Sequence, residues 1–121
     1  MQRRESAEMY LETILLLKEK QPCVRSIDVA RETGYAKPSV SRAMGLLRKN
    51  GQITVDALGY ISLTEEGAAA AQKVVERHRT LTEFLLRIGV SPETAEADAC
   101  RMEHDISDEA LACLKKHLSL L

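Results

Sequence analysis

Residues 26–63 read SIDVARETGYAKPSVSRAMGLLRKNGQITVDALGYISL, and this stretch decides the fold. It opens with a short helical segment, 27–33, for which Ser26 is the expected N-cap and Gly34 the residue that ends the helix. The next helix is expected over 37–49, because a proline in its first turn lacks only an N–H that has no helical partner. Two helices joined by a glycine-containing turn predict a helix-turn-helix.

A β-hairpin is expected directly after the second helix. Two short apolar runs, 53–55 and 60–63, flank a turn over 56–59. A helix-turn-helix followed by a hairpin is the order of a winged helix-turn-helix, which places its second helix in the major groove of DNA. The turn holds Asp56 and neither Lys nor Arg, so the wing is expected to contact phosphate weakly.

Helical patterns continue on both sides of this stretch. Further helices are expected over 5–20, 65–88, 92–105 and 108–118. The chain is therefore expected to be mainly α, with a winged helix-turn-helix DNA-binding domain over 1–64 and a helical domain over 65–121. We find no sequence repeat and no flexible linker between these two parts.

The charge of the chain divides at the same place. Residues 1–64 carry 10 Lys and Arg against 7 Asp and Glu, whereas 65–121 carry 7 against 11. Within 25–50 the ratio is 6 to 2, so the predicted helix-turn-helix can attract phosphate although the formal net charge is −1. The side chains expected to contact double-stranded DNA are Arg25, Ser26, Lys37, Pro38, Ser39, Ser41, Arg42 and Lys49.

Side chains with metal-ligand chemistry recur at helical spacing. The candidates are Met9, Glu12, His78, Glu96, Cys100, Glu103 and His104. Met9 and Glu12 are three residues apart and therefore share one face of a helix. Cys100, Glu103 and His104 are spaced by three and four residues, with the same consequence. Thioether, thiolate, imidazole and carboxylate groups that converge can hold a divalent transition metal, so the helical domain is expected to bind one.

Three blocks carry a family resemblance: EMYLE at 8–12, ERHR at 76–79 and DACRMEH at 98–104, which continues into ISDE at 106–109. On these blocks the chain resembles the diphtheria-toxin-repressor family of iron- and manganese-dependent repressors, over almost its whole length. The resemblance implies a DNA-binding transcriptional repressor that senses Fe²⁺ or Mn²⁺ and represses metal-uptake genes when metal-loaded. It also implies the short form of the family, without the SH3-like third domain.

The resemblance assigns roles to the ligand candidates. It implies a primary regulatory site made of Met9, Cys100, Glu103 and His104. His78 matches a ligand of a second site nearby, Glu12 a ligand position of the manganese branch, and Glu96 one of the iron branch. One turn after His78 the family usually has Glu, but this chain has Thr82, and Glu83 lies about 100° round the helix. Whether Glu12, Glu96 or Glu83 completes the second site stays open at this point.

Sulfur ligands decide which metal is expected. The manganese branch has carboxylates at the positions of Met9 and Cys100, and Mn²⁺ prefers carboxylate and water. A thioether and a thiolate suit softer ions, so Fe²⁺ is favoured over Mn²⁺ as the cofactor. Ni²⁺, Co²⁺ and Zn²⁺ are expected to bind in vitro as well, because affinity for such a site follows a general order among divalent metals.

The apolar stripes of the helical domain exceed what one small domain can bury, and a homodimer is therefore expected. The predicted interface comprises Leu81, Phe84, Leu85, Ile88, Leu111, Leu114 and Leu118, together with Leu121. A two-fold dimer predicts a pseudo-palindromic operator.

Other classes of protein are disfavoured. The polar, charged residues 1–8 do not form a signal peptide, and no apolar run is long enough to cross a membrane, so a cytoplasmic protein is expected. Cys23 and Cys113 are expected to be packing residues. Cys100 and His104 could form a nucleophile and base, but no third orienting group is apparent, so no enzymatic activity is expected. The alternative function is a metal-independent winged-helix regulator.

Overall fold

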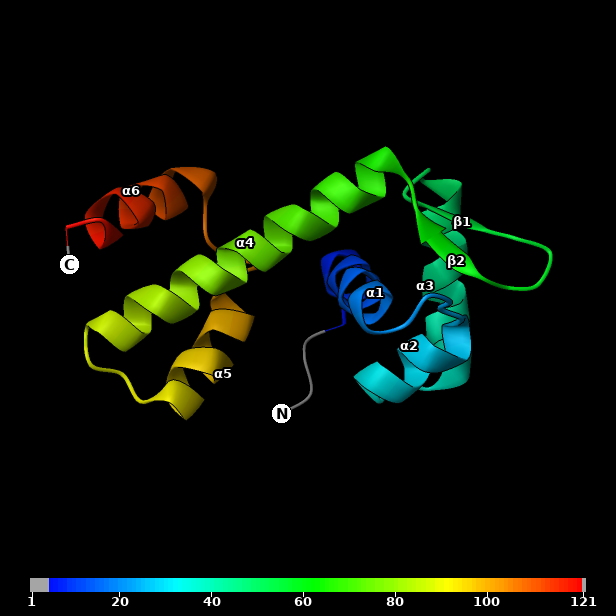
Figure 1. Cartoon of the computed structure of the whole chain (residues 1–121), viewed down its shortest axis with the longest axis horizontal. Coiled ribbons are helices and arrows are strands. Elements are labelled where there is room, and N and C mark those ends of the chain that lie inside the picture. The colour runs from blue at the N-terminus through cyan, green and yellow to red at the C-terminus, as the bar shows by residue number, and fades with distance from the viewer. Residues whose placement is uncertain (1–4, 121) are drawn as a thin grey trace. The chain divides into compact units, whose positions relative to one another are not determined.

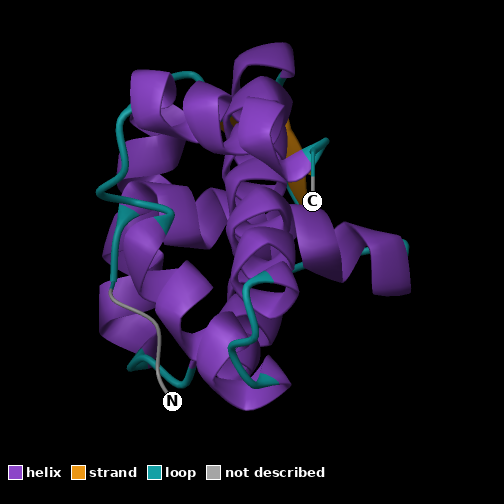
Figure 2. Cartoon of the chain, turned by 90° about the vertical axis from the view of Figure 1, so that its left-hand side faces the viewer, coloured by secondary structure: helices purple, strands orange, loops and turns teal. Residues whose placement is uncertain are grey.

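The computed structural model describes residues 5–120 and is mainly helical, which confirms the expected fold class (Figure 1). Its elements are α1 (Ala7–Lys20), α2 (Ser26–Thr33), α3 (Lys37–Lys49), β1 (Ile53–Val55), β2 (Ile61–Leu63), α4 (Glu65–Arg87), α5 (Pro92–Met102) and α6 (Asp108–Leu118). Figure 2 shows how far helix predominates over strand. None of the helices in the described part of the chain is long and apolar enough to span a bilayer.

The chain divides into two compact units, one ending at Gln72 and the other beginning at Lys73. We call residues 5–72 the reading unit and residues 73–120 the helical unit. The division falls inside α4, because the first turns of this helix pack on the reading unit, where Ala71 belongs to its apolar core. The domain boundary after residue 64 stays a prediction.

The helix-turn-helix is formed by α2 and α3. Gly34 ends α2 with φ +79°, a left-handed conformation that glycine adopts without a steric penalty. The helix begins at Ser26 rather than after it, because the Arg25 backbone N–H donates to the Asp28 carboxylate at 2.8 Å and makes Arg25 the N-cap. The expectation of Ser26 as the cap was therefore wrong by one residue.

The wing is an antiparallel hairpin in which Ile53 pairs with Leu63 and Val55 with Ile61. Its turn is closed by Asp56, whose Oδ1 accepts hydrogen bonds from the backbone N–H groups of Leu58 and Tyr60 at 2.9 Å each. The acidic residue at the tip is thus a turn former, as is common for Asp in such positions.

An apolar core holds the reading unit together. It is made of Met9, Tyr10, Leu11, Ile14, Leu17, Val24, Val29, Ala30, Val40, Met44, Leu47, Ile53, Ile61 and Ala71. The start of α4 lies so close to the wing that a Cβ built on Gly67 would be 1.8 Å from the carbonyl oxygen of Gln52. That same carbonyl accepts from the Thr64 backbone N–H at 3.1 Å, so the wing and α4 meet backbone to backbone.

The helical unit has a smaller apolar cluster, made of Leu81, Ala99 and Leu111, with Ile106 and Leu114 partly buried against it. An ion pair between Lys115 and Glu76 also joins α6 to α4, and the ammonium holds the pKa of the Glu76 carboxyl below its usual value.

Helix α5 ends at Met102, three residues before the expected end at 105. The backbone N–H groups of Asp105 and Ile106 both reach the Met102 carbonyl at 3.0 Å, so the chain tightens into a turn there. Glu103 keeps helical dihedral angles as the C-cap, whereas His104 lies beyond the helix.

Candidate metal centre and DNA-binding surface

The imidazole of His78, on α4, is the centre of a polar cluster in the helical unit. Its Nδ1 lies 2.8 Å from Glu103 Oε2 and 3.8 Å from Cys100 Sγ. Its Nε2 lies 3.0 Å from a carboxylate oxygen of Glu96. Residues from α4, α5 and the turn after α5 therefore meet on one ring. His78, Glu96 and Cys100 each offer a ligand atom, and these atoms all lie within 4.8 Å of one another.

The carboxylate of Glu103 is completely buried. Its Oε1 lies 3.3 Å from His104 Nε2, an ion-pair distance, but has no hydrogen-bond partner among the described residues. A buried carboxylate oxygen without a donor is costly in a folded protein and calls for a positive partner. His78 supplies part of this positive charge, because its contact with Cys100 and, second in size, its contact with Glu103 raise the pKa of His78 to about 11.

The donor set fits a divalent transition metal. Nitrogen and sulfur ligands bind such ions at about 2.0–2.3 Å, so atoms bound to one ion lie roughly 3–4.5 Å apart. The cluster of His78, Glu96 and Cys100 needs little movement to meet that spacing. The unbonded Oε1 of Glu103 adds an oxygen with a free lone pair. Imidazole, thiol and carboxylate together suit borderline ions such as Fe²⁺ and Zn²⁺.

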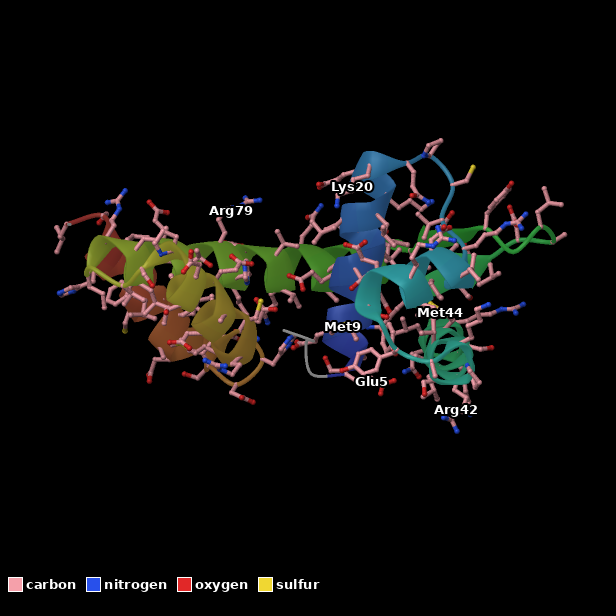
Figure 3. All side chains as sticks on the ribbon, turned by 90° about the horizontal axis from the view of Figure 1, so that it is seen from below. Glu5, Met9, Lys20, Arg42, Met44 and Arg79 are labelled. Carbon is pink, nitrogen blue, oxygen red and sulfur yellow. The ribbon has the colours of Figure 1, made fainter. Side chains whose placement is uncertain are left out.

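The other two ligand candidates, Met9 and Glu12, lie on α1 in the reading unit. Both side chains are buried. The Met9 sulfur lies 3.6 Å from the hydroxyl of Thr13, whose Oγ1 donates to the Met9 carbonyl at 2.8 Å. Figure 3 labels Met9 on this helix. The roles of Met9 and Glu12 as metal ligands stay predictions.

The candidates for completing the second site behave differently from one another. Glu96 faces His78, as described above. Glu83 forms an ion pair with Arg87 at 2.7 Å, one turn along α4. Thr82, at the position where a carboxylate was expected by resemblance, has a buried hydroxyl without a hydrogen-bond partner among the described residues. Of these residues, the helical unit brings only Glu96 to the His78 ring.

The predicted DNA-binding residues lie along α3 and at the start of α2. Arg25, Lys37, Pro38, Ser41, Arg42 and Lys49 are exposed, and Ser26 and Ser39 are half-buried. Arg42 projects from α3 away from the unit's interior (Figure 3). The guanidinium carbon of Arg25 lies 4.7 Å from the ring centroid of Tyr60, in the wing. No sequence pattern indicates this contact, so Tyr60 was missed.

Two of the residues expected in a dimer interface pack inside the chain. Leu81 and Leu111 fill the core of the helical unit within one chain, and their place in a dimer interface stays a prediction. Phe84, Leu85, Leu114 and Leu118 are half-buried, and 56% of Ile88 is exposed. Leu86 and Met102 are exposed apolar residues that the sequence did not single out. Leu121 lies outside the described residues.

The two remaining cysteines are also on the surface. Cys23 follows α1 and Cys113 lies on α6, and both are exposed. Their expected role as packing residues was therefore wrong within one chain.

A winged helix-turn-helix joined to a helical unit that gathers imidazole, thiol and carboxylate groups defines the class of metal-responsive DNA-binding regulators. Two family models agree with this class. Residues 4–57 match the iron dependent repressor N-terminal DNA binding domain, and residues 64–120 match the iron dependent repressor metal binding and dimerisation domain. The chain therefore belongs to the iron-dependent repressor family, which confirms the resemblance stated from its sequence.

Individual relatives are named as transcriptional regulators or repressors. The chain is 38% identical over 109 residues to the transcriptional regulator MntR of Escherichia coli O6:H1, covering 90% of this chain and 70% of the relative. It is 32% identical over 116 residues to the iron-dependent repressor IdeR of Mycobacterium bovis, covering 95% and 50%. These relatives are transcriptional regulators and not enzymes.

A solved structure agrees with the fold as well. A manganese-dependent transcriptional repressor in complex with manganese superposes with a TM-score of 0.87 at 28% identity, covering 96% of this chain and 54% of that chain. The chain thus spans about half the length of this structure and of the mycobacterial repressor.

Proposed function

We propose that this chain is a cytoplasmic repressor of metal-uptake genes that binds its operator as a homodimer when its helical unit holds Fe²⁺. One observation carries the proposal. The His78 ring lies between the thiol of Cys100 and the carboxylates of Glu96 and Glu103, in a chain whose relatives include an iron-dependent repressor and whose fold matches a manganese-dependent repressor.

His78, Glu96, Cys100 and Glu103 are the proposed ligands within the helical unit. His78 must give up a proton to bind an ion, and Cys100 must act as a thiolate. The ion supplies positive charge that the buried Glu103 carboxylate otherwise draws from the protonated imidazole. His104, Met9 and Glu12 are proposed to complete the coordination.

The sulfur ligand supports Fe²⁺ over Mn²⁺. A thiolate favours ions softer than Mn²⁺, which takes carboxylate and water by preference. Glu96 and Glu103 supply two carboxylates, and Mn²⁺ is therefore the second choice. Co²⁺, Ni²⁺ and Zn²⁺ are expected to occupy the site in vitro.

For DNA, we propose that α3 enters the major groove with Ser41 and Arg42 toward base edges, and that Lys37 and Lys49 contact phosphate. The exposed positions of these four side chains support this assignment. Exposed Ile88 and half-buried Phe84 and Leu118 are proposed for the dimer interface. Such a dimer would present two reading units to the two half-sites of a pseudo-palindromic operator.

Anaerobic titration of the reduced, metal-free chain with Fe²⁺ and Mn²⁺ tests the metal centre. Cys100→Ala should weaken Fe²⁺ binding by about tenfold or more, because a ligand is lost. Cys113→Ala is the matched control, since it removes an exposed thiol of the same unit and should leave binding unchanged. Full-strength binding in Cys100→Ala would contradict the proposed site.

Metal-dependent DNA binding is tested by selecting operators from random duplex DNA with the metal-loaded protein. Binding to the selected DNA should be lost on chelation of the metal and in Cys100→Ala, but kept in Cys113→Ala. Equal DNA binding with and without metal would support the alternative, a metal-independent winged-helix regulator.

A further inference from the structure

Arg77 is a buried cation beside the proposed metal centre. It precedes His78 on α4, and only 10% of its side chain is exposed. A guanidinium remains charged in proteins and brings five N–H donors, so burying it is costly unless those donors find acceptors. Its Nε has no hydrogen-bond partner among the described residues, so the contacts made by its two terminal nitrogens must account for its place there.

Both of those contacts lead to the segment that joins α5 to α6. Nη1 donates to the backbone carbonyl of Glu103 at 3.1 Å, and Nη2 donates to Asp108 Oδ1 at 2.6 Å. Glu103 is the C-cap of α5, and Asp108 is the first residue of α6. One planar guanidinium thus ties both ends of this segment to the helix that carries His78.

Asp108 is held in place from a second side. Lys73, one turn before Arg77 on α4, contacts the other carboxylate oxygen of Asp108 at 3.4 Å. The guanidinium of Arg77 and then the ammonium of Lys73 keep the pKa of Asp108 below its usual value, so this carboxylate stays charged. Lys73 shares Asp108 with Arg77, but only Arg77 also bonds the Glu103 carbonyl.

The Glu103 carbonyl is where this network meets the candidate ligands. The Glu103 carboxylate lies 2.8 Å from His78, and the next residue is His104. Both residues stand at or beyond the end of α5, where helical hydrogen bonds no longer fix the backbone fully. An external donor to the Glu103 carbonyl therefore restrains the peptide that connects two proposed ligands.

We propose that Arg77 is a positioning residue for the metal centre. Through the Glu103 carbonyl, it holds the carboxylate of Glu103 and the ring of His104 in place before an ion binds. This role rests on the proposed function as a metal-binding repressor. Partners that orient metal ligands typically change metal affinity by about 10- to 100-fold when they are mutated.

Anaerobic titration of the full chain with Co²⁺ tests the role, because the visible absorption of Co²⁺ reports both affinity and ligand geometry. Arg77→Lys keeps a cation but not the fork that spans Glu103 and Asp108, and Arg77→Gln removes the charge. Both should bind Co²⁺ about 10- to 100-fold more weakly, with a changed spectrum. The matched control, Lys73→Gln, should keep the wild-type affinity and spectrum.

Urea unfolding of each metal-free variant separates positioning from stability. Should Arg77→Gln not fold, Arg77→Lys decides the question. A folded Arg77→Lys with wild-type Co²⁺ affinity and spectrum would overturn the positioning role, whatever its stability. Absence of Co²⁺ binding in the wild type would overturn the proposed metal centre itself and the role of Arg77 with it, so the two failures are distinguishable.

Discussion

The two units of this chain are stabilised in different ways. The reading unit has a continuous apolar core to which α1, α2, α3, the wing and the start of α4 all contribute. The described part of the helical unit has a smaller apolar cluster, with three buried members, and encloses the charged groups of Arg77 and Glu103. Hydrophobic burial is largely independent of ligands, whereas buried charges depend on their partners. The comparison predicts that metal binding changes the stability of the helical unit more than that of α2, α3 and the wing.

Metal removal should separate the two units most clearly. An ion present at about 1,000 times its dissociation constant stabilises the form that binds it by about 4 kcal/mol. Native-state hydrogen exchange should therefore show chelation lowering the opening free energy of amides in α5 by about that amount, with a much smaller change in α3. An equal loss in both helices would contradict the contrast between the units.

A core substitution should have the next largest effect. Leu47 is 1% exposed in the reading unit, and its neighbour Leu46 is 61% exposed. Leu47→Ala should lower the free energy of unfolding by about 2–5 kcal/mol, through lost burial and the cavity left behind. Leu46→Ala, the matched control, should change it by less than about 0.5 kcal/mol. Urea denaturation of the metal-free chain measures both, and similar values would show that the core is not where the structure places it.

The smallest expected effect concerns the wing. Tyr60 stacks under the Arg25 guanidinium and should hold it ready for phosphate, at a gain of about 0.5–1 kcal/mol for an exposed pair. Tyr60→Leu should therefore weaken binding to the selected operator by about two- to fivefold, and Tyr60→Phe should keep the wild-type affinity. Fluorescence anisotropy at fixed salt measures the change, and identical affinities for the Leu and Phe variants would argue against stacking.

Local signals in the sequence were enough to predict most of the fold. Gly34 marks the end of α2 and Pro38 the start of α3, and the predicted helix over 37–49 matches the structure. The end of α5 carries no glycine or proline that would mark it in the sequence. The turn there is made by two backbone hydrogen bonds to the Met102 carbonyl, which no residue type signals. The sequence therefore placed that end too late.

The candidate site was predictable by residue type but not by arrangement. Helical spacing places Cys100 and Glu103 on one face of a segment, but it does not predict how far they lie from His78 on another helix. Periodicity also does not distinguish a helix face that packs in its own core from one that packs on a partner, which is why Leu81 was assigned to an interface. The contact between Arg25 and Tyr60 depends on tertiary structure alone.

The close approach of α4 to the wing restricts how this sequence can vary. A side chain at position 67 would collide with the main chain of Gln52, and a main-chain collision is not relieved by changing a rotamer. Every non-glycine residue there requires the hairpin and the helix to separate. Mutational drift can thus reshape the exposed face of α3 one residue at a time, whereas the junction at Gly67 changes only when several positions change together.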